Sequence, residues 1–395
     1  MTTITHTPAS QIKNRERTRE HHTSREPVVS IVIISYNYKR YLPFAVASAL
    51  GQTYSRVEIV LVDDGSTDGS REVIASFGDR LKPCLKANGG ETSANNTGFA
   101  MSTGEIIMFL DADDALHPKA AEEIVAHWRP EVAKAQFRLA TIDEEGGFIG
   151  AVVPSCAAIA TPEDIRLSVR ATGFYGWPPT SGNGYARWFL EEIMPLPIGE
   201  FPDAPDGVLN AVAPLYGDVI AIDQVLGYYR IHGANALASR QLGAKDIQRE
   251  LAMRTRETRY FLSCAARLGF ALKANPFDSM WFLERRMALL RLAPSLAGKG
   301  ESKWDLLSRA FRSPAPTDRS LFTRCILFIS FLIVALAPRR LANRVAELRL
   351  APGSRPKFFN FALRQFGSGV HTWLSASPQP VFQASGARTS DSGAR

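Results

Sequence analysis

The chain has 395 residues, of which 45% are apolar and 22% are charged. This length allows two domains or one large α/β domain with an appendage, and the composition is typical of globular proteins. The four cysteines form no CxxC pair, which argues against a disulfide framework or a structural zinc site and fits a reducing compartment.

The net charge of +7 is a local property of the chain. Of the 46 basic and 39 acidic residues, nine basic and one acidic lie in 319–364, which leaves 37 against 38 elsewhere. We expect no nucleic-acid partner, because such a protein would carry its positive charge on its folded body. Residues 1–26 are polar and hold no apolar core of a signal peptide, so we expect a disordered leader there.

Apolar, β-branched runs alternate with helical patterns in the first third of the chain. The predicted elements, in order, are strand 28–34, helix 42–50, strand 58–62, helix 73–77, a weaker strand 81–86, helix 96–101 and strand 105–110. Such alternation predicts a parallel sheet with right-handed crossovers. Ligands of these sheets bind outside the carboxyl ends of the strands.

Polar clusters follow the three strong strands at the points where the strands end. The clusters are Ser35-Tyr36, Asp63-Asp64 and Asp111-Ala112-Asp113-Asp114. Because these ends meet at one edge of the sheet, the clusters predict a binding site. Asp111 and Asp113 could hold Mg²⁺ or Mn²⁺ and leave positions open for phosphate oxygens. A solvated turn is the alternative for this pair, and Asx turns are the alternative for Asp63 and Asp68.

The second third of the chain gives weaker patterns. Residues 134–151 predict a hairpin, and a segment rich in Pro, Gly and Ser follows at 176–183. A helix is expected from Gly207, then a strand near 218–222 that leads to the sequence YRIH, and residues 246–311 have amphipathic helical patterns.

Residues 325–337 are uncharged and mostly apolar, with basic residues on both sides. A spanning helix needs about 20 residues, so this one is short. The basic flanks favour a helix that lies in or dips into a membrane leaflet, and a buried core helix is the alternative. Residues after 375 have low complexity and are expected to be disordered.

The ordered motifs VSIVIISYN, EIVLVDDGSTDGS, NGGETSANNTGFA and GEIIMFLDADD resemble the family 2 glycosyltransferases of the GT-A fold. The resemblance is strong over 28–115 and weaker to about 235, where TSGN and YRIHGAN are similar to segments of bacterial polysaccharide-type members. It implies an α/β, Rossmann-like, mostly parallel sheet with a mixed acceptor-side half. It also implies inverting transfer of a sugar from a nucleotide-diphosphate donor, with a UDP-type donor favoured.

The resemblance also implies roles for individual residues. Asp113 would bind the metal, and the donor would contact Ser35, Tyr36, Asp64, Asn88, Gly89, Asp111 and His232. The catalytic base would be Asp206, with Asp203 as the alternate. The chain departs from the family pattern at Asn95, where Arg is common, and it lacks the Glu of a Glu-Asp pair before Asp206. Helix capping is an alternative role for Asp206, and a structural hydrogen bond is one for His232.

Other functions fit the motifs less well. A haloacid-dehalogenase-type phosphatase would place its aspartates after the first strand, whereas two strong strands precede them here. A nucleotidyltransferase would need a glycine-rich loop after the first strand, and SYNYKRYLP has no glycine. A non-catalytic sugar-nucleotide-binding subunit of a membrane polysaccharide complex is the alternative from a different class.

These patterns predict the following organisation: leader 1–26, GT-A domain 27–245 with a nucleotide-sugar half 27–128 and an acceptor half 129–245, helical extension 246–312, basic apolar helices 319–374 and tail 375–395. The expected acceptor is a saccharide or a lipid-linked saccharide of a cell envelope or exopolysaccharide. The expected location is cytoplasmic, peripheral or monotopic on the inner face of a bacterial plasma membrane.

Overall fold

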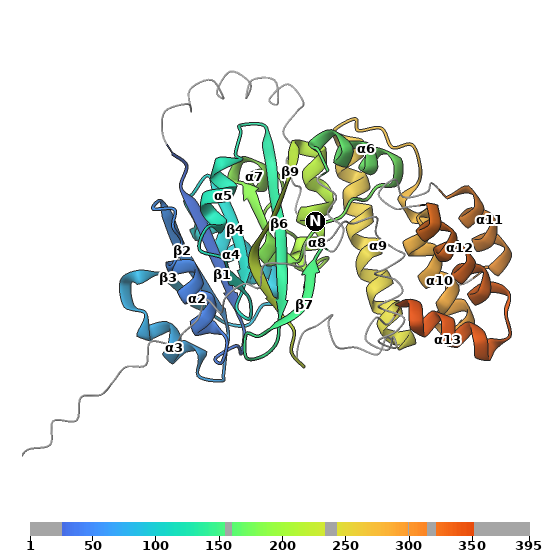
Figure 1. Cartoon of the computed structure of the whole chain (residues 1–395), viewed down its shortest axis with the longest axis horizontal. Coiled ribbons are helices and arrows are strands. Elements are labelled where there is room, and N and C mark those ends of the chain that lie inside the picture. Colours follow the sequence, from blue (N-terminus) through green and yellow to red (C-terminus); the bar gives the residue numbers. More distant parts are fainter. Residues whose placement is uncertain (1–25, 155–159, 234–242, 299, 314–320, 351–395) are drawn as a thin grey trace, which may run out of the picture.

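The computed structural model describes residues 26–154, 160–233, 243–298, 300–313 and 321–350. Within these residues one nine-stranded sheet has the order β3-β2-β1-β4-β8-β6-β9-β5, and β7 pairs with β6 at its side. The strands are β1 Val29–Ser35, β2 Val57–Asp64, β3 Lys82–Lys86, β4 Ile106–Asp111, β5 Ala115–Leu116, β6 Val132–Ile142, β7 Phe148–Val153, β8 Asn183–Ala186 and β9 Asp218–Arg230. Figure 1 shows the sheet at one side of the molecule and a helical region at the other.

The helices that accompany the sheet alternate with the strands early in the chain. They are α2 Leu42–Leu50, α3 Ser70–Ser76, α4 Glu91–Met101, α5 Ala120–Ala126, α6 Pro162–Thr172, α7 Arg187–Ile193 and α8 Pro205–Tyr216. The remaining helices form the second region of Figure 1. They are α9 Ala244–Arg267, α10 Met280–Leu292, α11 Lys303–Arg312, α12 Leu321–Leu336 and α13 Arg339–Leu350.

The first four strands form the parallel half that the sequence predicts. β1 pairs in parallel with β2 and β4, and β2 pairs in parallel with β3. Every residue of β1 is buried, since helices cover both faces of this half. Ile31 and Ile33 enter a core with α2 and α5, whereas Val32 and Ile34 enter a second core with α4. A Cβ at Gly98 of α4 would lie 2.2 Å from Val32 Cγ1, so this close helix crossing requires glycine.

The other half of the sheet is mixed, as expected. β8 lies between β4 and β6 and is antiparallel to both, so this short strand joins the two halves. β6 and β7 form the predicted hairpin. β9 extends eight residues past the predicted end at Ile222, to Arg230, because it pairs in parallel with β6 as far as Ile142. The α/β fold class expected from the sequence is confirmed.

The helical extension begins with α9, which packs along α8, and α8 in turn packs on β6 and β9 of the mixed half of the sheet. The amphipathic pattern of 246–311 is confirmed as α9, α10 and α11, with short 3₁₀ turns at Pro276–Asp278 and Pro294–Leu296 between them. α10 to α13 then form a bundle with its own apolar core.

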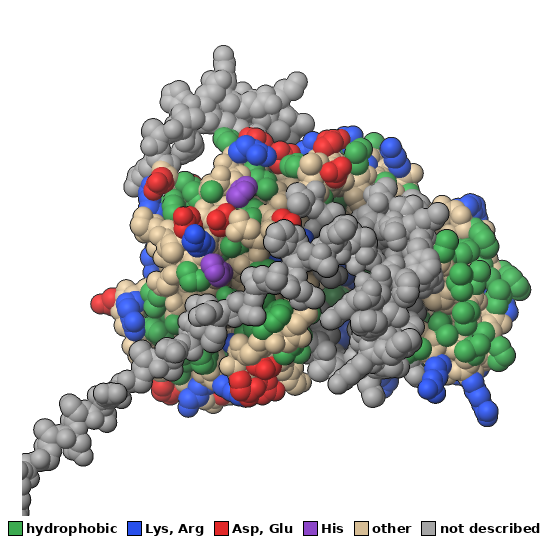
Figure 2. Space-filling model, in the orientation of Figure 1, with side chains coloured by type: hydrophobic (Ala, Val, Ile, Leu, Met, Phe, Trp, Pro, Cys, Tyr) green, Lys and Arg blue, Asp and Glu red, His purple; other side chains and the backbone are tan. Residues whose placement is uncertain are grey.

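The apolar stretch 325–337 lies in α12. Phe331, Val334 and Ala335 are buried in the bundle core, so one face of this helix is a core face. Ile329 and Leu336 are instead 55% and 53% exposed. Figure 2 shows hydrophobic side chains gathered over this end of the molecule, with Lys and Arg side chains around them. Among the residues that the structure describes, no helix combines the length and hydropathy needed for a bilayer span.

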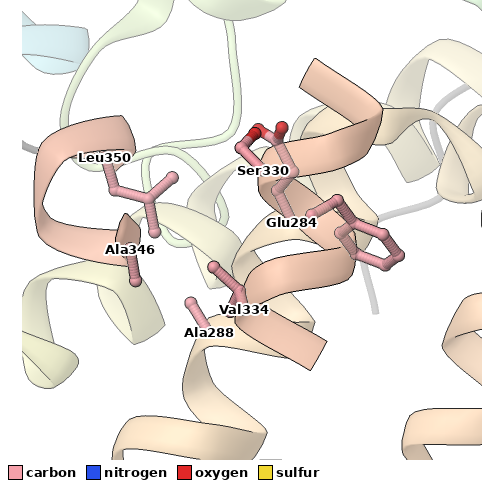
Figure 3. Close-up of a pocket in the computed structure, with 7 residues that line it drawn as sticks. Glu284, Ala288, Ser330, Val334, Ala346 and Leu350 are labelled. Atoms are coloured by element: carbon pink, nitrogen blue, oxygen red, sulfur yellow. The ribbon is translucent and has the colours of Figure 1, made fainter. Parts of the chain in front are cut away.

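A small hollow lies between α10, α12 and α13 (Figure 3). Ala288, Val334 and Leu350 line it, and the side chains of Glu284 and Ser330 lie side by side at its rim. Its volume of 10 Å³ is about that of one water-sized sphere, so it is a packing defect of the bundle and has no room for a ligand. The predicted leader (except residue 26) and the predicted tail lie outside the described residues, as does the part of 319–374 beyond residue 350.

Candidate functional site

The aspartates after β4 form a compact carboxylate cluster at the carboxyl edge of the parallel half. One carboxylate oxygen from each of Asp111, Asp113 and Asp114 lies within 4.8 Å of the other two. Burial and repulsion between the carboxylates raise the pKa of Asp111 and of Asp114 well above the usual range of an aspartate. A bound cation would stabilise such a cluster, because its charge would offset the repulsion between the carboxylates.

Asp113 is contacted by residues from two distant segments. His232 Nε2, two residues past the end of β9, lies 2.9 Å from Asp113 Oδ2, and both side chains are buried. Tyr38, in the loop after β1, donates its hydroxyl hydrogen bond to Asp113, and burial is the largest cause of the raised pKa of this tyrosine. Tyr41 stacks on the His232 ring with centroids 5.0 Å apart. These contacts fix the orientation of Asp113.

Asp114 has a positioning role that the sequence analysis did not assign. Its carboxylate accepts hydrogen bonds from Ser181 Oγ at 2.6 Å and from the Arg230 backbone N–H at 2.9 Å. The buried Arg230 guanidinium donates to the carbonyl oxygens of Asp113 and Asp143. The turn after β4 is therefore tied to β9 and to the β6–β7 hairpin.

A cleft of about 760 Å³ opens beside this cluster. Its walls come from the loop after β1, the end of β9 and the β6–β7 hairpin, and its lining includes Tyr38, Lys39, Arg40, Glu144 and His232. The lining of the cleft thus combines aromatic rings with charged groups of both signs, and it includes Tyr38 and His232, which contact Asp113.

Asp64 organises the loop after β3. Its carboxylate accepts hydrogen bonds from the backbone N–H groups of Gly89 at 3.0 Å and of Gly90 at 2.8 Å, and it pairs with Lys86. Asp64 is only 3% exposed. The predicted donor residue Asp64 is therefore placed directly against the predicted donor residue Gly89, and Asn88 is exposed at the tip of the same loop.

The remaining predicted residues of this edge differ in exposure. Ser35 at the end of β1 is fully buried, whereas Tyr36 is 47% exposed. Asp68 accepts from the Ser70 N–H, two residues on, at 3.0 Å, which is the predicted Asx turn, whereas Asp63 caps its loop by accepting from the Ser66 N–H, three residues on, at 3.1 Å. Those two aspartates shape loops.

Asp206 lies in the first turn of α8, where three parts of the molecule meet. The N-cap residue of α8 is Ala204, so Asp206 is not the cap. Burial raises the pKa of Asp206, and the charges of Arg254 on α9 and Lys134 on β6, with the Gly207 N–H, oppose that rise. The charge of Asp206 contributes to the raised pKa of Asp111, after burial and the charges of Asp114, Glu91 and Asp113. The alternate base, Asp203, is exposed and pairs with Arg249 at 3.1 Å.

Glu91, the first residue of α4, was missed by the sequence analysis. Its carboxylate accepts a hydrogen bond from the Ala204 N–H at 3.2 Å. Burial and the neighbouring charge of Asp206 raise the pKa of Glu91 to about 7. Its position directly after Asn88-Gly89-Gly90 was the available signal, but the predicted helix began only at residue 96, and the contact with residue 204 could not be inferred from the sequence.

A buried lysine lies on the other side of Asp206. Lys134 on β6 is fully buried, and it donates to Gln136 Oε1 at 2.8 Å and to the Tyr175 hydroxyl at 3.2 Å. Burial lowers its pKa well below that of an ordinary lysine. Glu257 of α9 is also buried, and it pairs with Arg254 at 2.7 Å. The surroundings of Asp206 thus include groups of both signs.

The residues present fit a divalent cation. Three carboxylates at the end of a rigid strand supply hard oxygen ligands, which Mg²⁺ and Mn²⁺ prefer. Asp113 carries a histidine in contact with it, an arrangement that fixes a ligating carboxylate. The cluster is therefore chemically suited to a divalent metal ion, and its oxygen ligands suit Mg²⁺ and Mn²⁺ equally.

Comparisons with known proteins agree with these motifs. Residues 30–151 match the model of the Glycosyl transferase family 2. An uncharacterized glycosyltransferase of Nostoc is 39% identical over 213 residues, which are 52% of this chain and 66% of the relative. The hyaluronan synthase of Pasteurella multocida is 42% identical over 104 residues, or 26% of this chain and 11% of the synthase.

Among solved structures, S. aureus TarS in complex with UDP-GlcNAc is similar at 12% identity and a TM-score of 0.43, with 82% of this chain and 92% of that chain covered. The chain thus spans less than two thirds of the length of the two sequence relatives.

Proposed function

We propose that this chain, whose residues 30–151 belong to glycosyl transferase family 2, moves a sugar from a nucleoside-diphosphate donor to a saccharide or lipid-linked acceptor. The observation that carries the proposal is the meeting of two acidic centres at one region of the fold. Asp111, Asp113 and Asp114 cluster at the end of β4, and Asp206 at the start of α8 lies within electrostatic reach of Asp111. One centre suits the leaving diphosphate, and the other suits the acceptor hydroxyl.

In the proposed reaction, Asp206 accepts the proton of the acceptor hydroxyl as its oxygen bonds to the anomeric carbon of the donor. The bond from that carbon to the diphosphate oxygen breaks on the opposite face, its electron pair leaves with the diphosphate, and the anomeric centre inverts. A divalent cation held by Asp113, with Asp111 and Asp114 beside it, would neutralise the charge that develops on the diphosphate. The raised pKa of Asp206 makes its carboxylate a stronger base.

The nucleotide would bind over the loop between β3 and α4, residues 87–90, which we call the donor loop. A carboxylate has about four acceptor sites. Asp64 accepts four hydrogen bonds from three donors, because Lys86 and Gly90 reach one oxygen each and the Gly89 N–H reaches both, so this carboxylate holds the loop in the shape over which the base would lie. The resemblance of the motifs to family 2 glycosyltransferases favours a UDP-type donor, with Tyr36, Asn88 and Gly89 as its exposed neighbours.

The domain limits are part of the proposal: the catalytic domain is 27–245, with the donor half at 27–128 and the acceptor half at 129–245, and 246–312 is a helical extension. α9 of that extension lies against α8, because Gly207 leaves room for Glu257, whose Oε1 would be 2.4 Å from a Cβ there. The extension therefore supports the segment that carries Asp206.

The activity test uses the full chain with Mg²⁺ or Mn²⁺ and a panel of UDP- and GDP-sugars, with nucleoside diphosphate release as the readout. We expect release from one donor class that depends on the metal and that increases with a saccharide acceptor. Binding of a nucleotide sugar without any release would instead favour the non-catalytic subunit.

We also propose that the end of the molecule formed by α11 to α13 rests on an anionic membrane surface, where a lipid-linked acceptor would be found. Trp304, Phe311 and Ile329 are more than half exposed, at 63%, 69% and 55%. The exposed Arg339 and Arg340 lie at the start of α13. Apolar side chains with basic neighbours suit the interface of a bilayer that carries anionic lipids.

This membrane contact is tested by point substitution, because deletion of α12 would uncover the bundle core. The Phe311→Glu/Ile329→Glu double variant should lose co-sedimentation with vesicles of phosphatidylglycerol and phosphatidylethanolamine. Phe148→Glu, which changes a 53% exposed phenylalanine of the sheet, is the matched control and should sediment like the unmodified chain. Equal binding of all three proteins would exclude this surface.

A further inference from the structure

The start of α4, directly after the donor loop, and the segment that leads into α8 are in direct contact. Glu91, at the start of α4, accepts the Ala204 N–H at 3.2 Å, and the Thr92 N–H donates to Pro202 O at 3.4 Å. A Cβ at Gly90 would lie 3.0 Å from the same Pro202 oxygen. Residues 90–92 therefore fit closely against residues 202–204, more than a hundred positions later in the chain.

The donor end of this contact is anchored on Asp64. Its carboxylate holds the N–H groups of Gly89 and Gly90, and Glu91 is the next residue. A nucleotide base that bonds to Asp64 shares the acceptor that positions those two amides. Any shift of the Gly89–Gly90 backbone is passed directly to Glu91, because only one peptide unit separates them.

The other end of the contact lies at a constrained backbone position. Ala204 has φ 54° and ψ 58°, a left-handed conformation that is unfavourable for a non-glycine residue. Pro205 follows, and a proline restricts the residue before it. The bond to Glu91 helps to hold Ala204 in this conformation. Asp206 is two residues further on, so the backbone conformation of Ala204 influences the position of the Asp206 side chain.

We propose that Glu91 is a positioning residue that couples occupation of the donor loop to the placement of Asp206. This inference rests on the proposed function, in which Asp206 is the base. Its role is mechanical: the carboxylate of Glu91 holds the Ala204 N–H and so fixes the start of α8 when the donor loop is ordered. The donor would thus prepare the base for the acceptor.

The test is hydrogen exchange of the full chain with Mn²⁺ and with UDP, GDP, ADP or CDP. We expect the nucleotide that slows exchange at 86–92 to slow it also at 203–208 in the unmodified protein. Glu91→Ala should retain the effect at 86–92 and lose it at 203–208. Glu91→Gln, which keeps an acceptor oxygen, should retain both, and Glu72→Ala, which changes an exposed acidic residue in the first turn of α3, is the control.

In turnover, Glu91→Ala should lower kcat by roughly 10- to 100-fold while donor affinity changes little, because a displaced base misaligns the acceptor. The inference is overturned if nucleotide protects 86–92 but not 203–208, or if Glu91→Ala retains protection of both. If no nucleotide protects 86–92, the proposed function fails as well. If Asp206→Asn turns over normally while the exchange coupling persists, only the base assignment fails.

Discussion

The two acidic centres of this protein are built in different ways. The aspartates after β4 stand at the end of a central strand with β1 beside it, and Ser181, Arg230 and His232 fix their orientation. Asp206 stands on a helix that starts from a strained residue, and loops and helices from three regions surround it. The strand-end aspartates are thus fixed by the sheet, whereas the proposed base, Asp206, depends on contacts with segments that are distant in the chain.

The largest expected effect is at the strand-end centre. Asp113→Ala should abolish turnover, a loss of at least about 10³-fold, because removal of charge stabilisation at the leaving group is among the costliest changes. Turnover and Mn²⁺-dependent binding of the nucleotide should be measured together. Unchanged metal dependence of binding would show that Asp113 is not a ligand.

A smaller effect is expected at the helix-borne centre. Asp206→Asn should lower turnover by about 10²- to 10⁴-fold, the range for loss of general-base catalysis, and should spare donor binding. Calorimetric titration with the nucleotide measures the donor affinity of this variant and of the unmodified chain. A parallel fall in donor affinity would make Asp206 a binding residue, and Asp203→Asn serves as the matched control because Asp203 is exposed and ion-paired.

The close packing of α4 on the parallel half of the sheet can be tested by measuring the free energy of unfolding, without an activity assay. Gly98→Ala would bring a Cβ to 2.2 Å from Val32 Cγ1 and should lower the free energy of unfolding by about 1–3 kcal/mol. Gly176→Ala, which places its Cβ in open space, is the control. If chemical denaturation shows equal stability for both variants, the α4 crossing is looser than the packing indicates.

The most delicate comparison is the pH dependence of Glu91. Its pKa is raised to about 7 in the folded chain from 4.5, so the folded state binds this proton more tightly and loses stability as pH rises between those values. Relative to the unmodified chain, Glu91→Gln should become more stable by on the order of 1–3 kcal/mol between pH 5 and pH 8. Thermal unfolding at both pH values checks this, with Glu72→Gln as control. An equal difference at the two pH values would contradict it.

Local sequence predicted much of the fold and one of the two centres. A continuous β-branched run predicts a strand without knowledge of the strands that pair with it, so β1, β2 and β4 were predicted. Asp64 and Asp113 lie at or just after the ends of β2 and β4, so their positions at the sheet edge were predicted with the strands. β9 was predicted too short, because only its pairing with β6 shows that the strand continues to Arg230.

Long-range contacts account for what the sequence could not predict. The contact of His232 with Asp113 joins residues 119 positions apart, and that of Glu91 with Ala204 joins residues 113 apart. The burial of Lys134 depends on β8 and β9, which flank β6. Local charge and residue spacing do not predict such long-range contacts, so the surroundings of Asp206 could be described only from the structure.

The position of β8 has a consequence for how the protein is made. This strand fills the place between β4 and β6, yet it is synthesised after both. Until the ribosome has released residue 186, β4 keeps an open edge and the β6–β7 hairpin has no link to the parallel half of the sheet. An emerging chain would therefore pass through a stage with an exposed apolar strand edge, the kind of surface that pairs with other chains and that chaperones protect.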